Sequence, residues 1–508
     1  MFYSLSRSQQ SWFLGVSLIT VLSFWMWFTH KDLTHMICSI DTQKWIDATK
    51  EISLNKFANA TEYDRLPLLP FIAQIFIWNG EIPIDALQSV SRLAWVISIG
   101  SFIGLLHYRF GGLGSFFGGL ILIFAQSYAQ LTLEVNAQIL LNMFFVLSLI
   151  WMNLFPLYPR FFSALLGLTG MLAALSKEQG LLLLPLLFLW VFIQGRRHQK
   201  LCGSVSWFLL SALPLGIWLY TWLYSMWYRG LKFAELRQDL ETLLNSPNWT
   251  YAIDQHLNWG KLRVTYDDPQ NYWETLINAW PRLTHDVGNH FVLSLWMLLL
   301  AGGVLIYGKY IKKHKIQTDW EGLVSGLILV LPMLPLFTML LIEPYHLSFL
   351  QIPATYFWSW SAVVLYKQGQ KYFRYWIFIP YTITLGFLLY SYQPFFYAIR
   401  GGIGACVAGR TMKVSQWVSR EYGKEQPIIF TDAMIEFDHL RNANYSYITK
   451  LEDLPKPCDT NAVIATSSWT TGYKELKDPL KGRFWKQVAV LPTISQEEWL
   501  VYSPYCPK

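Results

Sequence analysis

The stretch "ALSKEQGLLLLPLLFLW", from Ala174 to Trp190, decides the fold class because it places two charged residues inside a long apolar region. Lys177 and Glu178 separate two apolar segments, 161–175 and 180–194, that we predict as transmembrane helices. A charged side chain at the centre of a bilayer is costly. We therefore predict that Lys177 and Glu178 form a tight turn between two helices at the outer membrane surface, where they line a wet cavity.

The composition of the whole chain is that of a membrane protein. Of its 508 residues, 53% are hydrophobic, 17% are aromatic and only 14% are charged, whereas soluble domains carry about a quarter charged residues. The net charge of +7 does not indicate nucleic-acid binding, because the basic residues lie in short loops between apolar segments. The first apolar segment, Trp12 to Phe28, is too long for a signal-peptide core, so we expect it to be retained as a span.

The pattern of apolar segments predicts a polytopic α-helical membrane protein with about eleven transmembrane helices. The segment 66–78 is shorter and contains Pro67 and Pro70, so it fits a re-entrant or interfacial helix better than a span. The expected spans are 12–29, 86–106, 113–130, 136–154, 161–175, 180–194, 203–224, 289–307, 322–341, 350–366 and 375–392.

The distribution of Lys and Arg orients these helices. With the amino terminus inside, every inner loop is basic, as the positive-inside rule requires. These loops read "HYRFGG" (107–112), "YPRF" (158–161), "QGRRHQK" (194–200), "YGKYIKKHK" (307–315) and "YKQGQKYFR" (366–374).

Three long segments then lie outside the cytoplasm, and one of them has the pattern of a separate domain. They are the loops 30–85 and 226–287 and the tail 394–508. In the tail, short apolar segments such as "PIIFTD" and "NAVIATSS" alternate with charged stretches, which is typical of a small α/β domain. We thus expect a transmembrane catalytic domain over 1–393 and an extracytoplasmic domain over 394–508. Cys458 and Cys506 fall in this second domain, where an oxidising compartment would allow a disulfide, and the sequence leaves their pairing open.

Polar residues from four outer segments can share one cavity in this topology. They are Asp41 and Asp47 after the first span, Glu134 and Asn136 at a helix junction, the Lys177–Glu178 turn, and Glu343, Tyr345 and His346. Each has a plain alternative explanation: a carboxylate can cap a helix or face headgroup water, and a lysine near a helix end can extend to the surface. Their coincidence on one face favours a shared site.

Such a set of residues suits group transfer from a lipid phosphate. A carboxylate near the membrane surface can act as the general base that deprotonates a hydroxyl. Lys177, Arg65 and His346 are cationic candidates for binding the phosphate. The chain has no glycine-rich loop of the nucleotide-binding kind.

Five segments, in this order, resemble the GT-C glycosyltransferases, in the group that includes protein O-mannosyltransferases and lipid A aminoarabinose transferases. The resemblance covers roughly residues 10 to 395, and the order and spacing of the segments carry it. The segments are "DTQKWIDATKEI", "DRLPLLPFIAQIFIWNG", "SRLAWVISIGSFIGLLHYRFGG", "LEVNAQILLNMFFVLSLI" and "GMLAALSKEQGLLLLPLLFLW".

The resemblance implies transfer of a hexose or pentose from a polyprenyl- or dolichyl-phosphate carrier to an acceptor glycan, lipid or protein, with inversion, on the outer or lumenal side. It makes Asp41 the catalytic base or a metal-associated acid, and Lys177 the phosphate ligand with Arg65 and Arg92 nearby. Asp41 and Glu134 are the candidate ligands of a divalent metal. Asp41 is followed by Thr42, where many members have Glu. The further residues expected near the acceptor or the metal are Glu134, Asn136, Glu178, Glu343 and Tyr345.

Other functions remain open at this point. A ligase that moves a whole glycan from a lipid diphosphate would need more cations than the outer segments provide. A transporter or flippase commonly shows repeated halves, and this chain has no half-repeat. A purely structural membrane protein would not need the clustered outer polar residues. The 226–287 loop lacks the long inserted domain of eukaryotic O-mannosyltransferases, which favours a bacterial inner membrane with a periplasmic active face over an ER membrane.

Overall fold

The computed structural model describes a helical bundle and a β-sheet. The residues that the structure describes are 21, 45–46, 48–49, 52, 66–81, 83–125, 128, 131, 135–177, 179–228, 289–307, 320–331, 348–372, 382–383, 385–386, 414, 417–423, 425–430, 445–447, 455–456, 459–467, 485–492 and 498–505.

Four helices within this part of the chain are long and apolar enough to cross a membrane. They are Pro83–Gly112, the first part of α4 (Pro83–Ile123); α7 (Pro159–Ser176); α8 (Gln179–Arg197); and Leu201–Tyr224 of α9 (Leu201–Tyr228). The chain is therefore an integral membrane protein. The other described helices are α3 (Leu68–Trp78), α6 (Gln138–Leu154), α13 (Asn289–Ile306), α14 (Trp320–Ile328) and α16 (Gln351–Tyr372).

Most of the expected spans that fall on described residues coincide with helices. The boundaries of α6, α7, α8, α9 and α13 lie within a few residues of the prediction. Within the expected span 113–130, a helix covers Gly114–Ile123, it is interrupted at Phe124 and Ala125, and Tyr128 is again helical. The expected spans 12–29 and 375–392 and the second half of 322–341 lie almost wholly outside the described residues, so the total of eleven stays a prediction.

The segment 66–78 forms a helix, as predicted, and this helix is too short to cross a bilayer. α3 has 11 residues, which at 1.5 Å per residue gives about 16 Å, against a hydrocarbon core of about 30 Å. It packs against α4 and α7, and its Phe71 ring meets Trp218 of α9 edge to face at 5.2 Å.

The "HYRFGG" loop is a sharp reversal inside α4. Gly111 has φ 74° and divides two helical segments, and this left-handed conformation strains residues other than glycine. Across the turn, Gly118 and Gly119 lie so close to Leu106 and Ile103 that a Cβ would approach those side chains within 2.6 and 2.9 Å. The second segment thus folds back onto the first.

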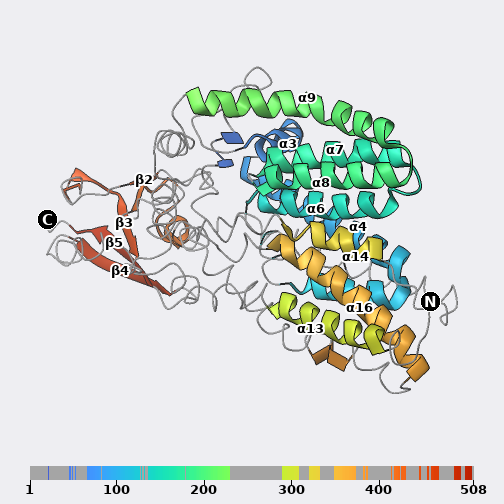
Figure 1. The fold of residues 1–508 in the computed structure, drawn as a ribbon. Coiled ribbons are helices and arrows are strands. Elements are labelled where there is room, and N and C mark those ends of the chain that lie inside the picture. The colour runs from blue at the N-terminus through green and yellow to red at the C-terminus, as the bar shows by residue number, and fades with distance from the viewer. Residues whose placement is uncertain are drawn as a thin grey trace, which may run out of the picture.

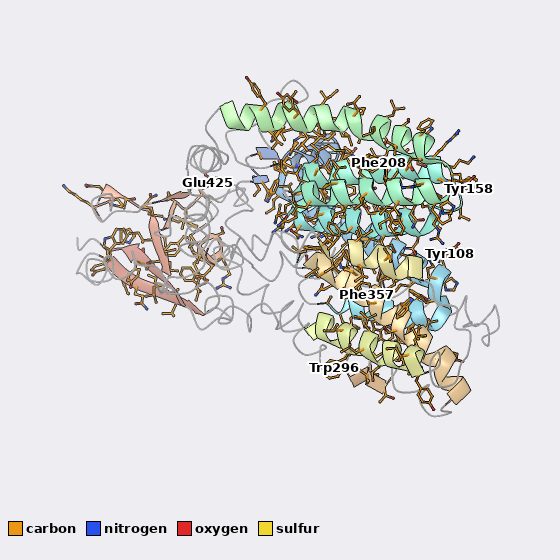
Figure 2. The ribbon with its side chains drawn as sticks, viewed as in Figure 1. Tyr108, Tyr158, Phe208, Trp296, Phe357 and Glu425 are labelled. Carbon is orange, nitrogen blue, oxygen red and sulfur yellow. The ribbon has the colours of Figure 1, made fainter. Side chains whose placement is uncertain are left out.

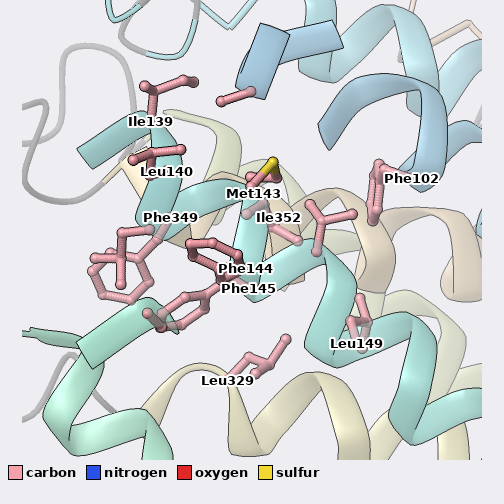
Figure 3. Packing of buried hydrophobic residues seen from close by; sticks show 14 of the residues in the cluster. Phe102, Ile139, Leu140, Met143, Phe144, Phe145, Leu149, Leu329, Phe349 and Ile352 are labelled. Carbon is pink, nitrogen blue, oxygen red and sulfur yellow. The ribbon is translucent and has the colours of Figure 1, made fainter. Parts of the chain in front are cut away.

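α6 is the central helix of the bundle. It packs against α4, α7, α8, α14 and α16, and nearly every residue from Gln138 to Met152 is buried. Figure 3 shows its Phe144 and Phe145 beside Phe349 and Ile352, which belong to the start of the α16 region. The Phe145 and Phe349 rings are 4.9 Å apart. Because α6 is covered on all sides, any polar group on it needs a partner within the protein.

The segments "PIIFTD" and "NAVIATSS" contain two strands of a five-stranded mixed sheet. The strands are β1 (Ile428–Phe430), β2 (Tyr445–Tyr447), β3 (Val463–Ser467), β4 (Trp485–Pro492) and β5 (Glu498–Pro504), and their order is β2-β1-β3-β5-β4. β1 pairs in parallel with β2 and β3, whereas β5 pairs antiparallel with β3 and β4.

Apolar residues are buried on both faces of this sheet. Val463 and Ala465 pack on one face with Val414 and Val418, which are four residues apart as on one side of a helix. Ile464 packs on the other face with Leu500. Figure 1 shows the sheet beyond the end of the helical bundle at which α9 ends. The location of this sheet outside the cytoplasm stays a prediction.

Candidate polar site at one end of the helical bundle

Three hydrogen bonds fix how α4, α6 and α16 run relative to one another. Arg109 Nε donates to Asn153 Oδ1 at 2.7 Å, and Tyr356 of α16 donates to the same oxygen at 3.0 Å. Eleven residues earlier on α6, Asn142 Nδ2 donates to Ser348 Oγ at 2.8 Å. Asn142 contacts Ser348, and the later residue Asn153 contacts the later residue Tyr356. The α16 region therefore runs parallel to α6.

Arg92 and Asn136 lie at a similar depth on neighbouring helices. Arg92 precedes Arg109 by seventeen residues, and Asn136 precedes Asn153 by the same number. Seventeen residues correspond to about 25 Å along a helix, and Arg109 and Asn153 are in direct contact. Tyr128, which follows the reversal in α4, bonds Ser98, so the chain has returned most of the way toward Arg92 before α6 begins. The structure therefore brings two of the predicted site residues to one end of the bundle.

Lys177 lies at the same end on the next helix. α7 runs antiparallel to α6, because a short turn joins them, and the Ser148 hydroxyl donates to Thr169 Oγ1 at 3.4 Å between them. Lys177 follows Thr169 by eight residues, or about 12 Å, and Asn136 precedes Ser148 by twelve, or about 18 Å. The two residues thus differ in depth by about one helical turn.

The predicted turn between two helices is confirmed. α7 ends at Ser176 and α8 begins at Gln179. Lys177 has an extended backbone and is half-buried; its N–H donates to the Ala173 carbonyl at 3.1 Å, and its own carbonyl accepts from Gly180 N–H at 2.9 Å. A Cβ on Gly180 would collide with the backbone of Ala173. Glycine at this position is therefore what allows α7 and α8 to meet in so short a turn.

Arg92 is a buried cation with acidic neighbours. Its side chain is 8% exposed, and Nη2 donates to Gln88 Oε1, one helical turn earlier, at 3.3 Å. The carboxylates of Asp85 and Glu81 lie within electrostatic range, and the Glu81 carboxylate accepts a hydrogen bond from Ser89. The Nε of Arg92 has no hydrogen-bond partner among the described residues, so it can donate one further hydrogen bond to an acceptor such as a phosphate oxygen.

Asn136 starts a row of amide side chains on α6. Its Oδ1 accepts from the backbone N–H of Gln138 at 3.0 Å, which caps the start of the helix. Gln138 Nε2 lies 3.4 Å from Asn142 Oδ1. Both Gln138 and Asn142 are fully buried, and the row continues to Ser348. This row links the start of α6 to the start of the α16 region.

Seven of the expected site residues lie outside the described residues. They are Asp41, Arg65, Glu134, Glu178, Glu343, Tyr345 and His346. In the described part of the chain, no group of three or more His, Cys, Asp or Glu side chains gathers as a metal site would require. Metal binding by Asp41 and Glu134 therefore stays a prediction.

The structure adds residues that the sequence interpretation did not single out. Asp85 and Gln88 follow the helix start at Pro83 and stand on the same helix face as Arg92, at the three- and four-residue spacing that could have identified them. Gln138 and Asn142 have the same four-residue spacing on an otherwise apolar helix. An amide pair inside an apolar segment is a signal for a buried polar row.

Comparison with known proteins finds no match among protein-family models and none among curated proteins. Two solved structures are similar in fold: crystal structures of ArnT from Cupriavidus metallidurans bound to undecaprenyl phosphate and in the apo state. Both are 13% identical to this chain. The first has a TM-score of 0.47 and covers 98% of each chain; the second has a TM-score of 0.44 and covers 97% of this chain and 98% of the other.

The fold and the polar end together define the class of protein. It is a multi-pass integral membrane protein whose buried polar and cationic side chains gather at the end of the helices nearest a β-sheet.

Proposed function

We propose that the protein is a membrane glycosyltransferase that moves a sugar from a polyprenyl-phosphate carrier to an acceptor hydroxyl on the outer face of the membrane. The observation that supports this most is the convergence of Arg92, Asn136 and Lys177 at one end of the bundle. A lipid phosphate anchored in the bilayer presents its charge at the membrane surface, and cations at that depth are suited to bind it.

In the proposed reaction, Lys177 and Arg92 stabilise the charge that develops on the leaving phosphate. Asp41 accepts the proton of the acceptor hydroxyl. The acceptor oxygen forms a bond to the anomeric carbon while the bond between that carbon and the phosphate oxygen breaks, which inverts the configuration. Free polyprenyl phosphate is the second product. Arg65 and His346 are proposed as further phosphate ligands.

The acceptor side of the proposed site comes from other outer segments. Glu134, Glu178, Glu343 and Tyr345 are proposed to contact the acceptor. If a divalent metal is bound, Asp41 and Glu134 supply oxygen ligands, and the metal contributes positive charge beside the phosphate. Asn136 then positions the start of α6, since its side chain caps that helix.

The test is transfer from a labelled polyprenyl-phosphate sugar by the purified full-length protein, measured as release of free carrier. Undecaprenyl phosphate, which is bound in one of the similar crystal structures, is the carrier to use first, with hexose and pentose donors in parallel. We expect Asp41→Asn and Lys177→Ala to reduce release by at least about 100-fold, the size of effect that general-base and electrostatic groups produce.

Two controls separate loss of chemistry from loss of structure. Lys177→Arg keeps a cation in the turn and should retain more activity than Lys177→Ala. Lys456→Ala removes an exposed lysine in the sheet region and should leave release unchanged. If the Asp41→Asn and Lys177→Ala variants release free carrier as fast as the wild type, the proposed roles of Asp41 and Lys177 are contradicted.

A further inference from the structure

The end of the bundle opposite the polar site carries a second charged surface. α7, α8 and α9 pack against one another, so that the start of α7, the end of α8 and the start of α9 meet there. Arg160 is the second residue of α7, Arg196 is in the last turn of α8, and Lys200 directly precedes α9. All three side chains are exposed. We call Arg160, Arg196 and Lys200 the basic corner.

A specific contact holds Arg160 against α9. A Cβ on Gly203 would lie 2.6 Å from Arg160 Nε and 3.3 Å from its Cδ and Cζ. The Arg160 side chain therefore lies directly on the backbone of Gly203, in the first turn of α9. Nearby, the His198 ring packs 6.2 Å from the Phe155 ring, so the α6–α7 connection contacts the α8–α9 connection. The basic corner is thus assembled from two connections of the chain and is not a run of neighbouring residues.

No acidic residue in these connections offsets the charge. The sequence has no Asp or Glu between Glu134 and Glu178, and none between Glu178 and Glu235. Three cations at one corner repel one another unless an anion neutralises them. The surface is therefore complementary to a ligand that carries negative charge.

Large side chains beside the basic corner indicate a membrane interface. Tyr158 is 69% exposed and Phe161 is 60% exposed, and both flank Arg160. Figure 2 shows Tyr158 and Tyr108 at the same end of the helices. Tyrosine, like tryptophan, is enriched at the level of lipid headgroups, and Phe161 adds apolar surface beside it. The anion that reaches the basic corner is thus expected at headgroup depth.

From this geometry we propose that the basic corner binds the headgroup of an anionic phospholipid in the leaflet opposite the polar site. The lipid phosphate lies between the Arg160 guanidinium and the side chains of Arg196 and Lys200, and its acyl chains lie beside Tyr158 and Phe161. Arg160 supplies a planar pair of donors, which suits a phosphate group. This site takes no part in the proposed sugar transfer, and the proposal of lipid binding does not depend on that activity.

The test is the number of lipids retained by the purified full-length protein in native mass spectrometry, with phosphatidylglycerol and phosphatidylcholine as the competing probes. We expect the wild type to retain phosphatidylglycerol preferentially. The triple variant Arg160→Gln, Arg196→Gln, Lys200→Gln should lose that preference by several-fold. The matched control is Lys309→Gln, Lys312→Gln, Lys313→Gln, which removes the same charge from another predicted inner loop and should keep the preference.

A second variant moves the guanidinium without changing the charge. Gly203→Ala introduces a methyl group where Arg160 lies, and the flexible end of the arginine side chain can move aside, so the helices remain packed. We expect its preference for phosphatidylglycerol to fall between those of the wild type and the triple variant. Circular dichroism and gel filtration check that each variant is folded.

Three results would overturn the proposal. They are a wild type with no preference for phosphatidylglycerol, an equal loss in the two triple variants, and displacement of the lipid by soluble glycerol phosphate at the same concentration. The second would show that total charge alone governs the binding. The third would show that the corner recognises a free phosphate and not a lipid.

Discussion

Arg109 and Asn153 form a hydrogen bond of 2.7 Å between Nε and Oδ1 that ties the reversal in α4 to the last turn of α6. The same amide accepts from Tyr356 OH, and its Nδ2 donates to the Leu149 carbonyl at 2.8 Å and to Ser325 Oγ at 3.3 Å. One buried amide thus connects α4, α6, α14 and α16.

We expect Asn153→Ala to destabilise the protein by about 2 kcal/mol, because it removes the hydrogen bonds to Arg109, Tyr356 and Ser325, and single hydrogen bonds in membrane proteins contribute on average about 0.6 kcal/mol. The measurement is the free energy of unfolding in detergent. Asn79→Ala is the matched control, since Asn79 is exposed and, among the described residues, its side-chain amide bonds only the Ile75 carbonyl. Equal effects of the two substitutions would contradict the role of Asn153 as a connection between four helices.

The α7–α8 turn gives a second prediction. Gly180→Ala should force α7 and α8 apart, because the added methyl group meets the Ala173 backbone, which cannot move aside as a flexible side chain can. The melting temperature should fall, and sugar transfer should fall with it if Lys177 binds the phosphate. The control is Gly303→Ala in α13, where no atom of the described residues lies within 4 Å of the new Cβ. That change should be neutral or stabilise by up to about 1 kcal/mol, since alanine favours a helix. A stable Gly180→Ala protein would show that the turn tolerates a wider spacing.

The end of α8 gives a third prediction. Gln199 has φ 53°, and Lys200 N–H bonds the Gly195 carbonyl at 2.8 Å, as in a glycine-type helix cap. A left-handed backbone costs a residue other than glycine about 1–2 kcal/mol. Gln199→Gly should therefore stabilise the protein by about 1 kcal/mol after allowing for the greater unfolded-state freedom of glycine. Gln199→Ala keeps the unfavourable backbone and should give no gain in thermal unfolding. If both variants gain equally, the backbone of Gln199 is not the cause.

Arg92 gives a fourth prediction, which concerns the donor phosphate. Arg92→Lys keeps the positive charge beside Asp85 and Glu81 but loses the planar donors of the guanidinium. We expect kcat/KM for the carrier-linked sugar to fall by about tenfold, which corresponds to one charge-assisted hydrogen bond, while the unfolding temperature changes little. Arg92→Gln should lower both quantities, because it leaves the two carboxylates without their cation. An Arg92→Lys protein with unchanged kcat/KM would place the phosphate elsewhere.

The sequence predicted the helices best where an apolar segment is bounded by charge or by a Gly or Pro residue. The Lys177–Glu178 pair marks the end of α7 and the start of α8, and the "QGRRHQK" loop marks the end of α8 and the start of α9, because charges leave the hydrocarbon region. The prediction of one continuous span over 113–130 was less accurate. Its helix is interrupted at Phe124 and Ala125, and Tyr128, which is again helical, makes a tertiary contact with Ser98. Hydrophobicity alone does not report either feature.

The candidate site was predictable only in part. The sequence singled out Arg92, Asn136 and Lys177, and the positive-inside rule placed the turn and the helix junction that hold Asn136 and Lys177 on one side of the membrane. It did not identify Gln88, Gln138 or Asn142, because a neutral amide in an apolar helix disturbs the hydropathy little. Their partners, such as Ser348, come from distant parts of the chain, and such pairings depend on how the helices pack.

The position of β5 in the sheet constrains the order in which this region can fold. β5 follows β4 in the sequence but lies between β4 and β3, where Val501 pairs with both Ala465 and Ala489. β4 therefore has no strand to join until β5 has also been exported. In the predicted topology both strands are exported across the membrane. Until β5 arrives, the partial sheet of β2, β1 and β3 has an unpaired edge along β3. A chaperone that shields such an edge would be most needed in that interval.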